Sequence, residues 1–218
     1  MILQAKQIVK SYGELPILNG VDLTIKEQEI VSIVGSSGAG KTTLLQILGT
    51  LDQPNSGELL INNIDPLALS HNELSAFRNK ELGFIFQFHQ LLPEFTACEN
   101  VMLPGLIRGD NKKEAQQRAE MLLEKLGLKD RLNHKPSELS GGEQQRAAVC
   151  RALFNNPKII FGDEPSGNLD TKNSQELHEL FFQLREEFKQ TFVIVTHNKE
   201  LAKMADRTLT MVDGNFIP

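Results

Sequence analysis

The sequence predicts an α/β fold: a mixed, mostly parallel sheet with helices on both faces, antiparallel strands at the N-terminus and an inserted helical subdomain. Short apolar runs of strand length recur along the chain, as in Ile30–Val34, Ile159–Phe161 and Phe192–Thr196. Helical patterns separate the last two, and an alternating order of strand and helix favours parallel pairing. Between about Gln87 and Cys150 the strand signals vanish and helical periodicity replaces them. That stretch is therefore predicted to be a helical insertion.

The N-terminal segment predicts three strands followed by a helix. Ile2–Lys10 and Gly20–Ile25 have strand patterns, and Tyr12-Gly13-Glu14 between them is typical of a turn. The next segment, Ile30–Val34, is a short apolar run suited to a buried parallel strand. It leads through a glycine-rich loop into Leu44–Leu48, which we expect to be a helix that ends at Gly49.

Three further helices are expected from apolar stripes and stop signals. The first lies in the insertion, ends at Gly127 and has one apolar face: Ala115, Ala119, Leu122, Leu123 and Leu126. The second is rich in alanine, follows Ser140 and runs to about Phe154, before Asn155-Asn156-Pro157. The third lies between the last two strands and carries a stripe of five residues: Leu177, Leu180, Phe181, Leu184 and Phe188.

Composition limits the classes of function. The 218 residues are 40% hydrophobic, which is enough for one sizeable core. The formal net charge of −5 gives no support for nucleic acid as a partner, and we expect none. The apolar runs are too short for a membrane helix, and the N-terminus lacks the layout of a signal peptide. We expect an intracellular chain with two reduced thiols, Cys98 and Cys150, whose link to any membrane comes through a partner.

One motif predicts a phosphate site. Gly35-Ser36-Ser37-Gly38-Ala39-Gly40-Lys41-Thr42 matches G-x-x-x-x-G-K-[ST] and lies between a predicted strand and a predicted helix. Glycines let backbone N–H groups turn toward phosphate oxygens, and the helix N-terminus adds its dipole. Lys41 can reach the β- and γ-phosphates, Thr42 can ligate Mg²⁺, and Thr43 can donate to the α-phosphate. Alone, the motif predicts only a nucleotide phosphate binder.

Two carboxylates follow a predicted strand. Ligands lie at the carboxyl ends of strands in open parallel sheets, so Asp163 is placed to hold Mg²⁺. Glu164 is the next residue and can polarise the attacking water as general base. The alternative is a strand that simply ends in an acidic turn.

A second anion site is predicted at another helix start. Ser140 is a candidate N-cap, and Gly141 and Gly142 expose backbone N–H groups at the N-terminus of the alanine-rich helix. A nucleotide has one triphosphate, which the first loop already holds. The spare site is explained if it closes over the γ-phosphate bound by a partner subunit. The alternative is an ordinary capped helix.

At this point the sequence resembles the ABC transporter ATPases over essentially its whole length. Leu139-Ser140-Gly141-Gly142-Glu143 is similar to the signature motif of that family, which acts across a homodimer with ATP at the interface. The resemblance implies ATP and Mg²⁺ as ligands. It also implies one ABC ATPase domain over residues 1–218, with a nucleotide-binding core at 1–87 and 151–218 and a helical signature subdomain at 88–150.

Four further sites carry roles implied by the resemblance. Tyr12 matches the aromatic residue that stacks on adenine, and Gln87 matches the glutamine that ligates Mg²⁺ and senses the membrane partner. His197 matches the histidine that contacts the γ-phosphate and positions Glu164. The segment Ser166–Asp170 matches the loop that carries contacts across the dimer.

Within the family, three segments are most similar to the LolD-type ATPases of lipoprotein-releasing complexes: Phe86–Ala97, Pro136–Glu143 and Glu164–Asp170. This resemblance implies a peripheral protein on the cytoplasmic face of the inner membrane, with a LolC/LolE-like permease contacting the region after Gln87. MacB-type efflux and FtsE-type regulation are the alternatives. Small departures from the usual pattern occur at Gly162, Ser166 and Asn198.

Four large apolar residues follow Gln87, and their purpose is open at the level of sequence. Phe88, Leu91, Leu92 and Phe95 surround Pro93, which prevents a regular helix there. They can form the core of the insertion. Alternatively, they form a partly exposed groove that receives a short helix of the membrane partner.

Overall fold

In the computed structural model, which describes residues 1–217, the central element is a six-stranded sheet in the order β5-β6-β7-β3-β8-β9. Its strands pair in parallel except for the last, which runs antiparallel to its neighbour. The six strands are β3 (Ile30–Val34), β5 (Leu82–Phe86), β6 (Ile159–Asp163), β7 (Thr191–Val195), β8 (Arg207–Val212) and β9 (Asn215–Ile217). The predicted mixed, mostly parallel sheet is confirmed.

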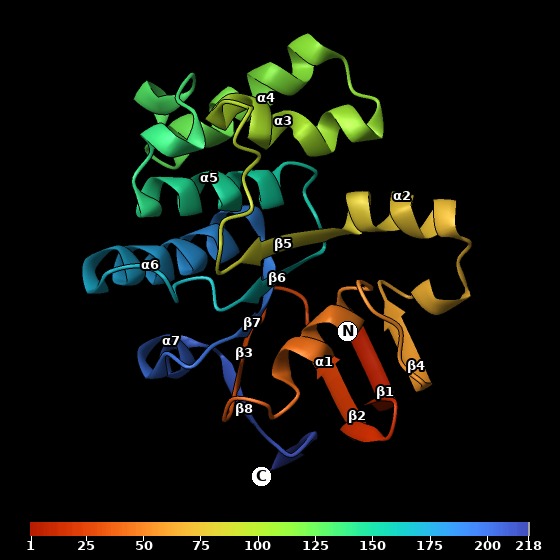
Figure 1. Cartoon of the computed structure of the whole chain (residues 1–218). Helices are drawn as coiled ribbons and strands as arrows, with labels where there is room; N and C mark the ends of the chain where they lie inside the picture. Colours follow the sequence, from red (N-terminus) through yellow and green to blue (C-terminus); the bar gives the residue numbers. More distant parts are fainter. Residues whose placement is uncertain (218) are drawn as a thin grey trace.

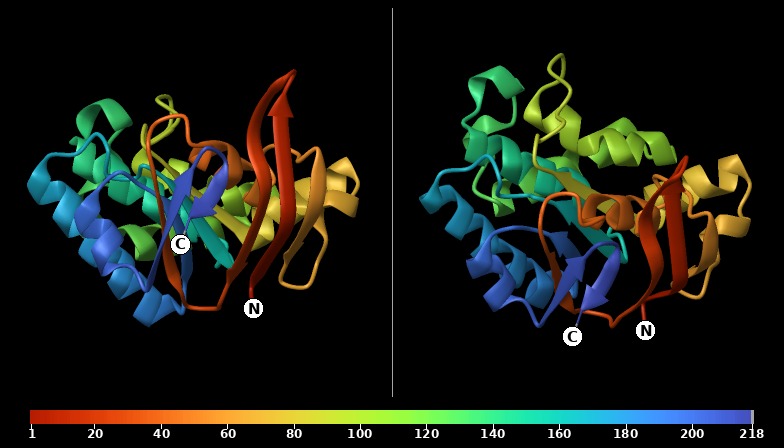
Figure 2. Two further views of the ribbon diagram at one scale, coloured as in Figure 1. Left: turned by 90° about the horizontal axis from the view of Figure 1, so that it is seen from below. Right: turned by 60° about the horizontal axis from the view of Figure 1, so that its bottom comes forward.

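The predicted antiparallel strands form a separate three-stranded sheet in the order β2-β1-β4. It consists of β1 (Leu3–Tyr12), β2 (Leu15–Ile25) and β4 (Ser56–Ile61). Gly13 turns the chain between the first two with φ of 60°, a conformation that glycine adopts readily. Figure 2 shows this sheet beside the C-terminal strands, and the two are joined where the Asn19 N–H donates to the Gly214 carbonyl at 3.1 Å.

The helical insertion lies above the sheet edge formed by β5 (Figure 1). It contains α3 (Ala97–Arg108), α4 (Lys112–Lys125) and α5 (Gly141–Leu153), with short 3₁₀ turns η2 (Lys129–Arg131) and η3 (Pro136–Glu138). No regular element occurs between the end of β5 and Ala97, as the position of Pro93 predicts. Helix α5 ends at Leu153, so the predicted division at residues 150 and 151 lies within its last turn.

The remaining helices cover the sheet or connect its strands. These are α1 (Lys41–Leu48), η1 (Pro66–Ala68), α2 (His71–Glu81), α6 (Thr171–Phe188) and α7 (Lys199–Met204). None of the helices among residues 1–217 combines the length and apolar character needed to cross a membrane.

Alternating side chains of the parallel strands supply two hydrophobic cores. In β7, Phe192 and Ile194 pack with the insertion and α6, whereas Val193 and Val195 pack with α1 and the N-terminal sheet. This follows from the two-residue period of a strand, which points successive side chains to opposite faces. The buried sheet therefore fixes its strand ends between two packed layers, and those ends carry the candidate site.

A test of this packing is the change Phe181→Ala in α6. Phe181 is fully buried, and its ring centroid lies 5.2 Å from that of Phe192. Because the change leaves a cavity in the larger core, we expect the free energy of unfolding to fall by about 3–5 kcal/mol. Chemical denaturation measures this loss. The adjacent, partly buried Phe182 is the control, and an equal loss in Phe182→Ala would contradict the assignment of the core.

Candidate functional site

A cavity of about 500 Å³ opens at the carboxyl ends of the central strands. Two of its lining residues, Ile17 and Val195, are apolar. The other ten come from the glycine-rich loop and from three positions predicted to be functional: Gly35, Ser37, Gly38, Gly40, Lys41, Thr42, Thr43, Gln87, Glu164 and His197. The fold therefore gathers side chains that are far apart in the sequence.

The glycine-rich loop has a backbone that other residues would strain. Gly38 and Gly40 have φ values of 81° and 97°, in the left-handed region. A Cβ on Gly40 would lie 2.9 Å from the Ile17 carbonyl oxygen, so a larger residue does not fit. Ser36, Ser37 and Gly38 are exposed, while Ala39 is buried beneath them. The loop thus presents its surface to the cavity and is anchored from below.

Helix α1 begins without a side-chain cap. Its N-cap residue is Gly40, and its first turn contains no acidic residue. The N–H groups of that turn are therefore free of a local side-chain acceptor, and the helix dipole makes them favourable for an anion. The ammonium of Lys41 lies across the loop and donates to the carbonyls of Gly35 and Ser36 at 2.9 and 2.8 Å. These features together form a positively polarised cradle.

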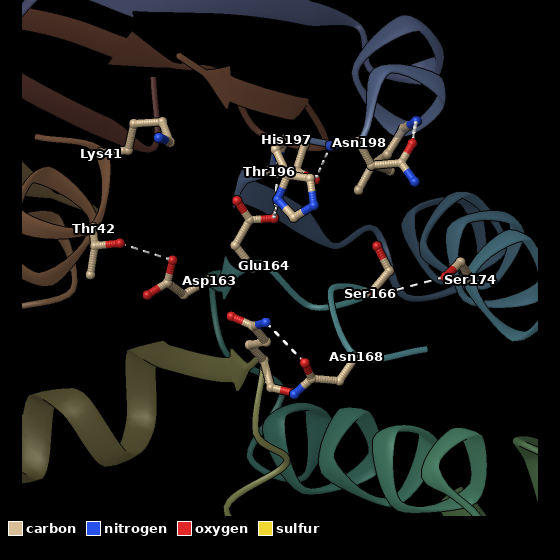
Figure 3. A network of polar contacts seen from close by, with 12 residues as sticks. Lys41, Thr42, Asp163, Glu164, Ser166, Asn168, Ser174, Thr196, His197 and Asn198 are labelled. Carbon is tan, nitrogen blue, oxygen red and sulfur yellow. Dashed lines mark hydrogen bonds and ion pairs between the residues drawn. The ribbon is translucent and has the colours of Figure 1, made fainter. Parts of the chain in front are cut away.

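The two acidic residues at the end of β6 have different surroundings. The Thr42 hydroxyl donates to Asp163 Oδ1 at 3.2 Å (Figure 3). Burial raises the pKa of Asp163, and the nearby charge of Glu164 acts in the same direction, against the Thr42 hydrogen bond and Lys41. Ionisation of the Asp163 carboxyl is therefore unfavourable in this site, and a cation bound beside it would stabilise the ionised form.

Glu164 is paired with His197. Its Oε2 accepts a hydrogen bond from the His197 backbone N–H at 3.1 Å and lies 2.8 Å from the imidazole Nδ1. Glu164 has φ of 48°, which is uncommon for a residue with a side chain and costs about 1–3 kcal/mol. Its N–H donates to Val195 and its carbonyl accepts from Gly167, both at 2.9 Å. The strained backbone is thus held from both sides, and the carboxylate has one defined position.

Gln87 is joined to the loop after Glu164. Its Nε2 donates to Asn168 Oδ1 at 3.0 Å, and Asn168 Nδ2 donates back to the Gln87 carbonyl at 3.2 Å. Gly167 lies close to the side-chain amide of Gln87: a Cβ added at Gly167 would lie 3.0 Å from Gln87 Nε2. No sequence pattern predicts this pair, because Asn168 is 81 positions from Gln87 and only the folded sheet brings the two residues together.

The cavity residues suit a hard cation. Thr42, Asp163 and Gln87 can offer hydroxyl, carboxylate and amide oxygens, which are the donors that Mg²⁺ prefers. Among residues 1–217, no three His, Cys, Asp or Glu side chains gather as a metal site. Thr42 and Asp163 are already within hydrogen-bonding distance of each other.

Tyr12 lies apart from the cavity lining. Its side chain is half exposed, and its hydroxyl donates to Asp52 Oδ2 at 2.7 Å. This hydrogen bond is the main reason why the pKa of Tyr12 is raised, whereas Lys10 and the Thr43 hydroxyl lower it slightly. The Lys10 ammonium lies 5.0 Å from the ring centroid and also bonds Asp52 at 2.8 Å. Asp52 and Lys10, which the motifs did not reveal, thus fix an aromatic ring beside the end of the loop.

The signature residues occupy a different surface. Ser140 and Gly141 are exposed at the start of α5, and neither lines the cavity. The Ser140 hydroxyl donates to Glu143 Oε2 at 2.8 Å, and Arg131 donates to Glu143 Oε1 at 2.8 Å. The Ser140 backbone N–H also donates to Glu143 Oε2 at 2.8 Å, and this bond, together with those from the Ser140 hydroxyl and Arg131, lowers the pKa of Glu143 to about 2. Gly142 is buried against Asn173. One chain therefore holds two separate candidate anion sites, and the second is internally capped.

Known proteins match the chain over nearly its full length. A profile described as ABC transporter matches residues 18–167. The lipoprotein-releasing system ATP-binding protein LolD of Bacteroides fragilis (strain YCH46) is 60% identical over 216 residues, covering 99% of this chain and 100% of that protein. The LolD protein of Porphyromonas gingivalis (strain ATCC BAA-308 / W83) is 61% identical over 214 residues, covering 98% of each.

Solved structures agree in fold. A dimeric post-hydrolysis state of the ATP-binding cassette MJ0796, bound to ADP and Pi, superposes with a TM-score of 0.90 and 41% identity. The alignment covers 99% of this chain and 97% of that one. A second dimeric structure of MJ0796, a bacterial ABC transporter cassette, gives the same TM-score with 42% identity.

Asp163→Asn tests the charge at this site. Burial disfavours the ionised Asp163 carboxylate in the folded protein and so lowers the free energy of unfolding. This loss is absent at low pH, where the carboxyl is protonated, and grows as the pH rises through the raised pKa. We expect the neutral amide, which can still accept from Thr42, to raise the melting temperature without Mg²⁺ or nucleotide at pH 8. An increase of about 2–4 °C corresponds to about 1 kcal/mol in a domain of this size.

The same variant should lose the additional stabilisation that Mg-ATP gives the wild type, because a proposed cation ligand is gone. Thermal melts with and without Mg-ATP measure both effects. Asp130→Asn, at an exposed position in η2, is the matched control. A lower melting temperature combined with full stabilisation by Mg-ATP would contradict this interpretation.

Proposed function

This chain belongs to the ABC transporter family, and we propose that it is the ATP-hydrolysing subunit of a complex that releases lipoproteins from the inner membrane. The observation that carries the ATPase part is the position of Glu164, which is held by His197 at the edge of a cavity formed by an uncapped helix and its glycine-rich loop. The lipoprotein part rests on relatives named LolD that are 60 and 61% identical over nearly the whole chain.

The cavity residues divide the chemistry between binding and water activation. The loop N–H groups and Lys41 bind the triphosphate, and charge neutralisation lowers the barrier of phosphoryl transfer. Lys41 would exchange two carbonyl partners for phosphate oxygens, so its position is prepared before the ligand arrives. Glu164 accepts the proton of the attacking water as general base, and His197 orients that carboxylate. Thr42, Asp163 and Gln87 would hold Mg²⁺, which neutralises phosphate charge when bound.

The second anion site supports a dimer as the working state. Ser140 and Gly141 are exposed and separate from the cavity of their own chain, so they are accessible to a partner's nucleotide. The solved relatives MJ0796 are dimeric. We propose a two-fold homodimer with two ATP molecules at the interface, in which Ser140, Gly141 and Gly142 face the partner's γ-phosphate. Tyr12 would stack on adenine at the outer end of each site.

A groove beside the insertion supports a membrane partner. A cavity of about 420 Å³ lies between β5, α2, α3 and α5. Its apolar lining consists of Leu82, Phe84, Phe86, Leu92, Leu103, Pro104, Ile107 and Ala152. Leu92 is 42% exposed there, whereas Leu91 packs against the larger core. Leu91 therefore fits the core alternative and Leu92 the groove alternative, whereas Phe88 and Phe95 are exposed and belong to neither the core cluster nor the groove lining.

This groove is suited to a short apolar helix of a LolC/LolE-like permease. Buried apolar anchors dominate the energy of such contacts. Phe86 lines the groove and directly precedes Gln87. A partner bound in the groove would therefore contact the residue next to a proposed Mg²⁺ ligand. A chain that binds a permease in this way would lie on the cytoplasmic face of the inner membrane.

Glu164→Gln tests the proposed activity. The amide cannot accept the proton of water, so we expect turnover to fall by about 10²–10⁴ while ATP binding is retained. ATP should then accumulate a dimer that size-exclusion chromatography detects, and cells carrying only this variant should retain lipoproteins in the inner membrane. Glu179→Gln, at an exposed position in α6, is the control. Normal hydrolysis in Glu164→Gln would remove the general-base role, and normal lipoprotein release would remove the transport role.

Leu92→Asp tests the partner groove. Because Leu92 is 42% exposed, the charged variant should fold with a melting temperature close to that of the wild type and keep its basal ATPase activity. We expect it to lose stimulation by the membrane partner, since a charge replaces an apolar anchor. Met121→Asp is the control, because Met121 is 51% exposed on α4 and does not line the groove. A large drop in melting temperature for Leu92→Asp alone would show that Leu92 belongs to the core.

A further inference from the structure

Gln145 in helix α5 is a buried amide that joins three elements. Its side chain is fully buried, and its Nε2 donates to the carbonyl of Pro165 at 2.6 Å and to the carbonyl of Phe86 at 3.3 Å. Pro165 directly follows Glu164, and Phe86 directly precedes Gln87. One NH₂ group from the signature helix therefore holds the backbone beside the proposed general base and beside the proposed Mg²⁺ ligand.

Packing alone does not account for this residue. The Oε1 of Gln145 is buried and has no hydrogen-bond partner within the described residues 1–217. A buried polar atom without a partner opposes folding, and an apolar side chain of similar volume would avoid that cost. What a glutamine supplies here, and an apolar residue does not, is the pair of N–H donors.

The anchored segment is one that requires support. Glu164 has a strained φ of 48°, and such backbones persist only where neighbouring contacts hold them. Helix α6 contacts Ser166, two residues after Glu164. His178 Nε2 lies 3.0 Å from Ser166 Oγ, and the Ser174 hydroxyl donates to the Ser166 carbonyl at 3.4 Å. Figure 3 shows the contact between Ser166, in the segment after Glu164, and Ser174 of α6. Gln145 alone among these side chains also reaches β5.

We infer that Gln145 is a positioning residue for ATP hydrolysis, transmitting the position of helix α5 to Glu164 and Gln87. At 1.5 Å per residue it lies about 7.5 Å along the helix from Ser140. A movement of the helix that seats Ser140 on the partner's nucleotide therefore moves both anchored carbonyls. This inference rests on the proposed ATPase function, and it assigns to Gln145 no contact with ATP.

The test uses Gln145→Met, which keeps the volume and removes the donors. We expect kcat for ATP hydrolysis to fall by about tenfold or more, because small displacements of catalytic groups have effects of that size or larger, while KM stays within about twofold. Gln145→Asn, which keeps the amide and shortens its reach, should show the same selective loss of kcat. It also provides a second result if the methionine variant is poorly folded.

Gln190→Met is a matched control. Gln190 is also buried, and its Nε2 donates to the carbonyls of Pro157 and Thr191 at 3.1 and 3.3 Å. Gln190 directly precedes β7, so it lies at the amino ends of the parallel strands, whereas the cavity lies at their carboxyl ends. Thermal melts of both methionine variants show how much stability each change removes. We expect Gln190→Met to keep the wild-type kcat even where its melting temperature falls as far as that of Gln145→Met.

A double variant identifies the route. If Gln145 acts through Glu164, adding Gln145→Met to Glu164→Gln should change the residual rate by less than about twofold. Wild-type kcat in both Gln145 variants, an equal loss in Gln190→Met, or full additivity in the double variant would overturn the inference. Absence of ATP hydrolysis in the wild type would instead overturn the proposed function.

Discussion

Parallel pairing in register aligns Phe86, Asp163 and Val195 across three neighbouring strands, and the arrangement of the site depends on this alignment. Each of these residues is the last of its strand, so the residues that follow them leave the sheet together at the carboxyl ends of the strands. Gln87, Glu164 and His197 therefore meet although they come from separate parts of the sequence. A one-residue slip in either pairing would point the wrong side chain into the cavity.

Two helix N-termini in the chain differ in whether a side chain caps them. Helix α1 begins at a glycine without a cap, whereas α5 begins at Ser140 with the ionised Glu143 closing its first turn. An anion can enter the first directly. At the second, Glu143 is neutralised by Arg131, and a phosphate must take the Ser140 hydroxyl away from that carboxylate. The first end is therefore suited to tight binding, and the second to the weaker contact that we propose for the assembled dimer.

Local sequence signals predicted much of the fold, and the misses have a common cause. Ile30–Val34 is a strand over the predicted range, and Gly49 ends α1. The elements β4, α2, α7, β8 and β9 were not anticipated, because they have short or weakly apolar patterns and are determined by tertiary contacts. The candidate site divides in the same way: motifs located Lys41, Asp163 and Glu164, whereas the Gln87–Asn168 pair and the Gln145 bridge depend on strand register.

The strand order also has a consequence for synthesis on the ribosome. Strand β3, which leads into the glycine-rich loop, is made early but lies between β7 and β8, which are made late. Until nearly the whole chain has been translated, this apolar strand has neither of its neighbours, and its unpaired edges are open to wrong contacts. Nascent chains should therefore gain affinity for nucleotide late and abruptly. A truncation before β8 would leave an aggregation-prone fragment even though it contains every residue of the loop.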